Sequence, residues 1–203
     1  MTPGRRDSAS RERILRAAAD VAAEHGYAGT TIARITERSG LPASSVYWFF
    51  EDKDDLLAAV VLHHFEAWLA LRPQWRPLAP GEGVVELLGD LLRPGVRALA
   101  HSPDYLRLGQ TLLLESRQGA SAARARFLEL REEGMRAFEA WFVEALRSTG
   151  SPAPERLAAE LAQVVVVATD GLFLSYRSGD LLDPDLFLEL LLDTVAEALR
   201  TDG

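Results

Sequence analysis

The sequence predicts an all-α protein, with an N-terminal three-helix helix-turn-helix unit followed by a larger helical C-terminal domain. Leucine and alanine dominate its 203 residues, and the alternating pattern of a half-buried strand is absent. Segments that contain glycine and proline separate the stretches with helical periodicity. Residues 30–50 read as two short helices around a tight Ser39-Gly40 turn, which is the layout of a helix-turn-helix.

A first helix is predicted over residues 11–25, after a flexible arm at residues 1–10. Gly26 is expected to end this helix. The apolar residues of the helix fall on one face at helical spacing, so we expect that face to be buried. These residues are Ile14, Leu15, Ala18, Val21 and Ala22.

The second and third helices are short. Thr30 or Thr31 caps the second helix with its hydroxyl oxygen. Gly40 supplies a residue that can adopt the left-handed conformation of the turn. The third helix is predicted over residues 42–49, with Pro42 in the first turn, where a missing N–H is no loss.

A fourth helix begins with Asp52 as its N-cap and ends before Pro73. Further helices are predicted near residues 83–101 (with a possible interruption at Pro94-Gly95), 103–118, 121–148, 154–178 and 184–201. The last two are apolar almost all round, so each needs more than one packing partner. The predicted domains are residues 11–52 and residues 53–203.

The charge of the chain is unusual for a nucleic-acid-binding protein. Its net charge is −8, whereas such proteins are usually basic. Residues 1–56 contain 8 basic and 9 acidic side chains, which gives −1, so most of the acidity lies in the rest of the chain. Any contact with DNA is therefore expected to be small and local.

Cysteine is absent, which excludes disulfides and thiolate chemistry. The N-terminus lacks the apolar stretch of a secretory signal, and the apolar run at residues 164–168 is too short to cross a bilayer. We therefore expect a soluble, cytoplasmic protein without a membrane partner.

The N-terminal pattern resembles that of the TetR family of bacterial transcriptional regulators over residues 11–57. The pattern comprises Ile14-Leu15-x-Ala17-Ala18, Gly26-Tyr27-x-x-Thr30-Thr31, Ile35, Gly40, Val46-Tyr47-x-x-Phe50 and Lys53-x-x-Leu56. The resemblance implies DNA binding through the third helix, a homodimer formed by the last two helices, and a small-molecule pocket in the C-terminal domain.

The expected DNA contacts lie on the third helix and at the starts of the second and fourth. The third helix is predicted to expose Ala43, Ser44, Ser45, Tyr47 and Trp48, and the resemblance implies phosphate contacts by Thr31, Tyr47 and Lys53. The third helix has no arginine, asparagine or glutamine for bidentate base reading. Hydroxyls, apolar contact with thymine methyls, Arg34 or DNA shape would then read the sequence. Pairing of Lys53 with neighbouring acidic residues is the structural alternative.

The resemblance also implies an effector pocket, for which aromatic and polar residues are the candidates. They are Phe65, Trp68, Tyr105, Gln110, Glu115, Phe138, Trp141 and Phe142. A plain core role is the alternative for each. The four histidines have no recognised metal-ligand spacing, and phosphate-binding and dinucleotide motifs are absent, so we expect no metal, no cofactor and no catalytic residue.

The sequence is interpreted as that of a dimeric repressor that binds a palindromic DNA operator and is released by a small molecule. Two alternatives stay open. One is a helix-turn-helix protein without a small effector, acting architecturally or through a protein partner. The other is a helical-bundle carrier or enzyme whose N-terminal part only resembles the motif.

Overall fold

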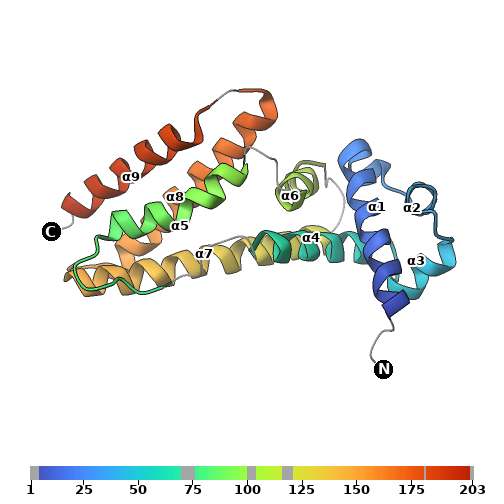
Figure 1. The fold of residues 1–203 in the computed structure, drawn as a ribbon, viewed down its shortest axis with the longest axis horizontal. Helices are drawn as coiled ribbons and strands as arrows, with labels where there is room; N and C mark the ends of the chain where they lie inside the picture. Colours follow the sequence, from blue (N-terminus) through green and yellow to red (C-terminus); the bar gives the residue numbers. More distant parts are fainter. Residues whose placement is uncertain (1–4, 70–75, 100–103, 116–120, 181, 202–203) are drawn as a thin grey trace. The chain divides into compact units, whose positions relative to one another are not determined.

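The computed structural model describes residues 5–69, 76–99, 104–115, 121–180 and 182–201, and every regular element in these ranges is an α-helix. The all-α prediction is thereby confirmed. Figure 1 shows the order of the helices along the chain. The helices are α1 (Arg5–Gly29), α2 (Ile32–Ser39), α3 (Ala43–Phe49), α4 (Lys53–Leu69), α5 (Val84–Leu99), α6 (Asp104–Glu115), α7 (Ala122–Thr149), α8 (Pro154–Ser178) and α9 (Pro184–Thr201).

The chain divides into two compact units. The N-terminal unit comprises residues 1–68 and 103–130, and the C-terminal unit comprises residues 69–102 and 131–203. The N-terminal unit is larger than the predicted DNA-binding domain of residues 11–52, because most of α4, α6 and the start of α7 cluster with the helix-turn-helix.

In the N-terminal unit, α1 packs against α2, α3 and α6. The helix begins at Arg5, so residues 5–10 are helical and not the flexible arm that we expected. Asp7 lies in the first turn, where the helix dipole favours a carboxylate. Gly26 interrupts α1 with φ 70°, at the residue predicted to end the helix, and a further turn follows to Gly29. The apolar face predicted for this helix is buried.

In the C-terminal unit, α5 packs against α9, and α8 packs against both. The approach of α5 to α9 is close at Gly89, where an added Cβ would lie 2.9 Å from a methyl carbon of Leu192. Arg97 of α5 donates two hydrogen bonds to Asp185 of α9, at 2.9 and 3.1 Å. Helix α5 continues through Pro94 without the interruption that we considered, and buried residues lie on both sides of this proline.

After this packing, α8 and α9 still expose large apolar side chains. On α8 these are Val164, Val167 and Leu174, and at α9 they are Leu182, Leu186 and Leu190. Within the described part of the chain, α8 is the one helix long and apolar enough to cross a membrane by length and composition alone. Its apolar residues are divided between a face buried in the C-terminal unit and the exposed set named above.

Candidate nucleic-acid interface

The turn between α2 and α3 is held by short-range hydrogen bonds. Of the two threonines proposed as the cap of α2, Thr31 is the N-cap, and its Oγ1 accepts a 3.3 Å hydrogen bond from the N–H of Arg34. Gly40 adopts the left-handed conformation with φ 66° and ψ 20°, which favours glycine. From α1, Arg13 donates a 2.5 Å hydrogen bond to the carbonyl of Ser39. The turn is thereby tied to α1.

Helix α3 buries one side and exposes two large aromatic residues on the other. Val46 and the following Phe50 are buried in the N-terminal unit. Tyr47 is 57% exposed and Trp48 is 77% exposed. Both lie on the helix that a helix-turn-helix inserts into the major groove.

The smaller residues of α3 complete this surface. Ala43 and Ser44 are exposed, whereas Ser45 is only half-buried and therefore less accessible than we expected. Pro42 is the N-cap and lies outside the first turn; its carbonyl accepts a 2.9 Å hydrogen bond from the N–H of Ser45. The outward face of α3 thus offers hydroxyl and apolar groups, with no charged side chain.

Thr31 and Arg34 are exposed at the start of α2. The Thr31 hydroxyl accepts the capping hydrogen bond, so its own O–H remains able to donate to a phosphate oxygen. Arg34 donates from Nη1 to the carbonyl of Gly29, which holds the guanidinium beside the end of α1. The remaining guanidinium N–H groups keep Arg34 among the candidate contacts.

Lys53, at the first position of α4, is held by α1. Its Nζ donates a 3.1 Å hydrogen bond to the carbonyl of Tyr27 and lies 4.1 Å from the centroid of the Tyr27 ring. Within the described part of the chain, Lys53 forms no ion pair with a carboxylate, so the alternative of pairing with neighbouring acidic residues is not observed there. An ammonium has three donors, and the two that remain are available to a phosphate.

The acidic residues around Lys53 accept hydrogen bonds from other groups. Asp52 caps α4, as predicted, by accepting from the N–H groups of Asp54 and Asp55 at 2.7 and 2.8 Å. Asp55 in turn accepts a 3.0 Å hydrogen bond from the N–H of Glu51. These carboxylates therefore stabilise the start of α4, and the observed hydrogen bond of Lys53 is to the carbonyl of Tyr27.

Asp54 joins three parts of the N-terminal unit, which the sequence did not reveal. Its carboxylate accepts from the Tyr27 hydroxyl at 3.1 Å, from the Ser121 hydroxyl at 2.7 Å and from the N–H of Ala122. Burial, followed by the negative charge of Asp54, raises the pKa of the Tyr27 hydroxyl. Ser121 also caps α7 by accepting from the N–H of Arg124 at 3.2 Å. A serine before a helix is a sequence signal for a cap, but its contact with Asp54 joins positions 67 residues apart.

The residues predicted to line an effector pocket lie in both units. Phe65 and Gln110 belong to the N-terminal unit, where Phe65 is buried and Gln110 is half-buried. Phe138, Trp141 and Phe142 are buried in the C-terminal unit. The side chains of Trp68, Tyr105 and Glu115 lie outside the described residues.

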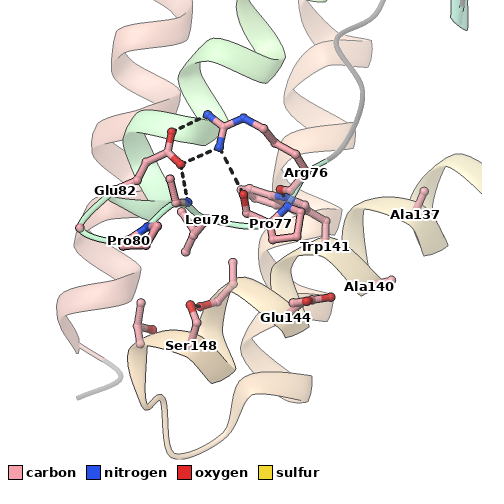
Figure 2. A pocket seen from close by; sticks show the side chains of 14 residues that line it. Arg76, Pro77, Leu78, Pro80, Glu82, Ala137, Ala140, Trp141, Glu144 and Ser148 are labelled. Carbon is pink, nitrogen blue, oxygen red and sulfur yellow. Dashed lines mark hydrogen bonds and ion pairs between the residues drawn. The ribbon is translucent and has the colours of Figure 1, made fainter.

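The C-terminal unit contains a cleft that Trp141 borders, and Trp141 is the one member of the predicted set with a described side chain that does so (Figure 2). The cleft separates residues 76–82 from the C-terminal half of α7. Trp141 Nε1 donates a 2.9 Å hydrogen bond to the carbonyl of Arg76, which ties the segment to α7. The other two buried aromatics of α7, Phe138 and Phe142, do not line this cleft.

Comparisons with known proteins agree with this geometry. The model of the family described as bacterial regulatory proteins, tetR family, matches residues 14–60, which include α2, α3 and the start of α4. The HTH-type transcriptional regulator RutR from Escherichia coli K12 is 29% identical over 126 residues, covering 59% of this chain and 55% of RutR. The chain therefore matches only about half the length of these curated relatives.

Solved structures share the fold over almost the whole chain. A transcriptional regulator from Rhodococcus sp. Rha1 superposes with a TM-score of 0.67 at 22% identity, over 94% of this chain and 96% of that one. The transcriptional regulator FadR from Bacillus subtilis, solved in complex with stearoyl-CoA, superposes with a TM-score of 0.66 at 18% identity, over 91% and 96%.

Proposed function

We propose, since this chain belongs to the TetR family of bacterial regulatory proteins, that it binds double-stranded DNA through α3 and regulates transcription in response to a small molecule. The observation that carries this proposal is the exposed pair Tyr47 and Trp48 on a helix whose other side is buried. A helix oriented in this way can enter the major groove while groups beside it hold the phosphates.

The proposed phosphate contacts surround α3. The Tyr47 hydroxyl, the Thr31 hydroxyl with the N-terminus of α2, and the Lys53 ammonium with the N-terminus of α4 each present donors. Arg34 adds a guanidinium beside Thr31. Few positive charges take part, so we expect DNA affinity to depend less steeply on salt than that of strongly basic binding domains.

Base reading is proposed to come from the apolar and hydroxyl groups of α3. Trp48 and Ala43 offer apolar surface to thymine methyl groups, and Ser44 and Ser45 offer hydroxyls to base edges. Without a bidentate side chain on this helix, DNA shape and Arg34 supply the remaining discrimination.

We propose a homodimer formed by the exposed apolar surface of α8 and α9. Val164, Val167 and Leu174 recur at helical spacing on α8, and Leu186 and Leu190 lie one turn apart on α9. A twofold dimer buries such a self-complementary surface and presents two α3 helices to two half-sites of a palindromic operator, about 34–36 Å apart.

We propose that the effector acts by favouring one of two conformations. A small molecule that binds more tightly to the conformation with mismatched α3 helices would release the operator, as a repressor requires. The cytoplasm, where DNA and metabolites are both accessible, is the proposed location. The FadR relative was solved with an acyl-CoA, which illustrates ligand binding on this fold without naming the effector of this chain.

Selection of genomic fragments with the purified protein tests the proposal. We expect enrichment of a short inverted repeat, followed by saturable binding of that duplex and its loss in the presence of a metabolite from the neighbouring genes. Binding that never exceeds the non-specific background for any fragment would contradict the proposed function. Specific binding without a response to any metabolite would contradict its ligand-dependent part.

A further inference from the structure

The C-terminal unit contains a cleft of about 560 Å³ between the segment of residues 76–82 and the C-terminal half of α7 (Figure 2). Small-molecule sites have volumes of roughly 300–1,000 Å³, so this cleft has the size of a ligand site. Its walls are mainly apolar, with Pro77, Leu78 and Pro80 on the segment and Ala140 and Trp141 on α7.

Hydrogen bonds within the wall hold the segment in place. Arg76 and Glu82 form a bidentate pair at 2.5 and 2.7 Å, and Glu82 also accepts from the N–H of Ala79 at 2.9 Å. Trp141 fastens the carbonyl of Arg76 to α7. The charge of Arg76 is therefore neutralised within the wall, and the Trp141 N–H is already used.

The hydroxyl and carboxylate groups that remain toward the cleft on α7 are acceptors. Ser148 and Thr149 donate their hydroxyl protons to the carbonyls of Ala145 and Leu146, at 2.7 and 2.9 Å. The lone pairs of the two hydroxyl oxygens remain able to accept hydrogen bonds from a ligand. Glu144 is exposed on the same helix, across from the Arg76–Glu82 pair (Figure 2), and forms no ion pair within the described part of the chain.

Charge and hydrogen bonding select the same class of ligand. One arginine and two glutamates line the cleft, which gives a net charge of −1 that belongs to Glu144. A carboxylate and hydroxyl lone pairs bind donors, and a cation satisfies both the charge and the lone pairs. The apolar wall beside them requires an apolar body on the same molecule.

We propose that this cleft binds a small organic cation, with its ammonium at Glu144 and Ser148 and its apolar body against Leu78 and Trp141. The site differs from the set predicted from the sequence: of the five members whose side chains the structure describes, it contains Trp141 alone. The proposal concerns the C-terminal unit and does not depend on DNA binding.

Isothermal titration calorimetry of the full chain with three probes of one carbon skeleton tests the charge requirement. The probes are 4-phenylbutylammonium, 4-phenylbutanol and 4-phenylbutyrate. We expect the ammonium to bind up to about fivefold more tightly than the alcohol, because a partly exposed ion pair contributes at most about 1 kcal/mol. The carboxylate is expected to bind most weakly, because it faces Glu144 with a like charge.

Matched variants locate the site. Glu144→Gln should lower the affinity for the ammonium to that for the alcohol, whereas Glu139→Gln, on the same helix but outside the cleft, should change neither. Ala140→Trp, at an exposed position of the wall, should abolish binding of both probes while circular dichroism shows the fold intact. Equal affinity for ammonium and alcohol, no heat from the ammonium probe, or equal behaviour of the two glutamate variants would overturn the proposal. The assay contains no DNA, so its failure leaves the proposed DNA binding untouched.

Discussion

The ammonium of Lys53 lies 4.1 Å from the centroid of the Tyr27 ring and donates a 3.1 Å hydrogen bond to the carbonyl of the same residue. Tyr27 follows the interruption of α1 at Gly26, and Lys53 begins α4. The contact therefore fixes the only lysine of the chain against the end of α1. A cation held in one place by a carbonyl and an aromatic face loses little side-chain freedom when it meets a phosphate.

Replacing Lys53 with methionine should weaken binding to every DNA sequence by a similar factor. Methionine keeps apolar contact with Tyr27 but removes the charge that displaces a counterion from DNA. We expect the slope of log affinity against log salt to become shallower by about 0.9, the value for one phosphate contact. Fluorescence anisotropy with an operator duplex and a scrambled duplex, each over a range of salt, measures this slope.

Lys53→Arg is the matched control because it keeps the charge, and it should keep the salt slope. A methionine variant that folds normally and retains the full slope would contradict the assigned phosphate contact.

Ser121→Ala should destabilise the N-terminal unit. Ser121 donates to Asp54 at 2.7 Å and accepts from the N–H of Arg124 at 3.2 Å, so alanine removes a helix cap and one donor to a carboxylate. We expect a loss of about 1–3 kcal/mol in the free energy of unfolding, measured with urea. Ser44→Ala, at an exposed position of α3, is the control. Equal stability of the two variants would show that the Asp54–Ser121 contact contributes nothing.

Local signals predicted most of the helices. Pro154 and Gly179 bound α8 where we expected them, and Thr31, Gly40 and Asp52 perform the capping and turn roles that their side chains and backbone allow. The start of α1 was predicted too late. Residues 5–10 are polar or small, so they form helix without extending the apolar pattern from which the start was predicted.

The candidate site was less predictable than the fold. The predicted exposure of Tyr47 and Trp48 on the third helix is confirmed. The partner of Lys53 did not, because Tyr27 lies 26 positions away and nearer acids offered a simpler pairing. Contacts of this kind depend on how helices pack, for which a single sequence contains no direct signal.

Trp48 is predicted to read thymine methyl groups, and replacement of operator thymines with deoxyuridine tests this directly. Each methyl that Trp48 covers should contribute about 0.8 kcal/mol, or about fourfold in affinity. Wild-type protein should lose affinity on the substituted duplex, whereas Trp48→Ala should bind both duplexes equally and more weakly. Because Trp48 is 77% exposed, the variant should unfold at the same urea concentration as wild type.

The same loss in both proteins would show that another group reads the methyls. No effect of deoxyuridine on either protein would remove methyl contacts from the recognition mechanism.

The stability of the C-terminal unit should decrease in acid through Glu82. Hydrogen bonds from Arg76 lower the pKa of Glu82 from 4.5 to about 2. A carboxyl whose pKa is lowered on folding stabilises the native state above its unfolded pKa, and this contribution disappears as pH falls from 4.5 towards 2. Glu82→Gln should therefore be less stable than wild type at neutral pH, and the difference should shrink below pH 4.5.

Urea unfolding over a pH series measures the difference, with Glu189→Gln as the control. Glu189 is exposed on α9 and has no ion pair within the described residues, so its variant should follow the wild type. If the difference in free energy of unfolding between Glu82→Gln and wild type stays constant as the pH falls from 4.5 towards 2, the assigned role of the Arg76–Glu82 pair is wrong.

Leu186→Glu should convert the proposed homodimer into a monomer. Leu186 is exposed on α9 beside Leu190. Burial of one such leucine in the interface stabilises the dimer by about 1.5–3 kcal/mol. Twofold symmetry places the substitution in the interface twice. Leu114→Glu provides a stringent control, because Leu114 is 79% exposed on α6, in the N-terminal unit, and lies outside the proposed interface. Sedimentation velocity at micromolar protein should give a monomer for Leu186→Glu and a dimer for wild type and Leu114→Glu.

Because one α3 helix reaches only one half-site, the monomer should also lose binding to the full operator while keeping its circular dichroism spectrum. A monomeric wild type, or a dimeric Leu186→Glu, would remove α9 from the proposed interface.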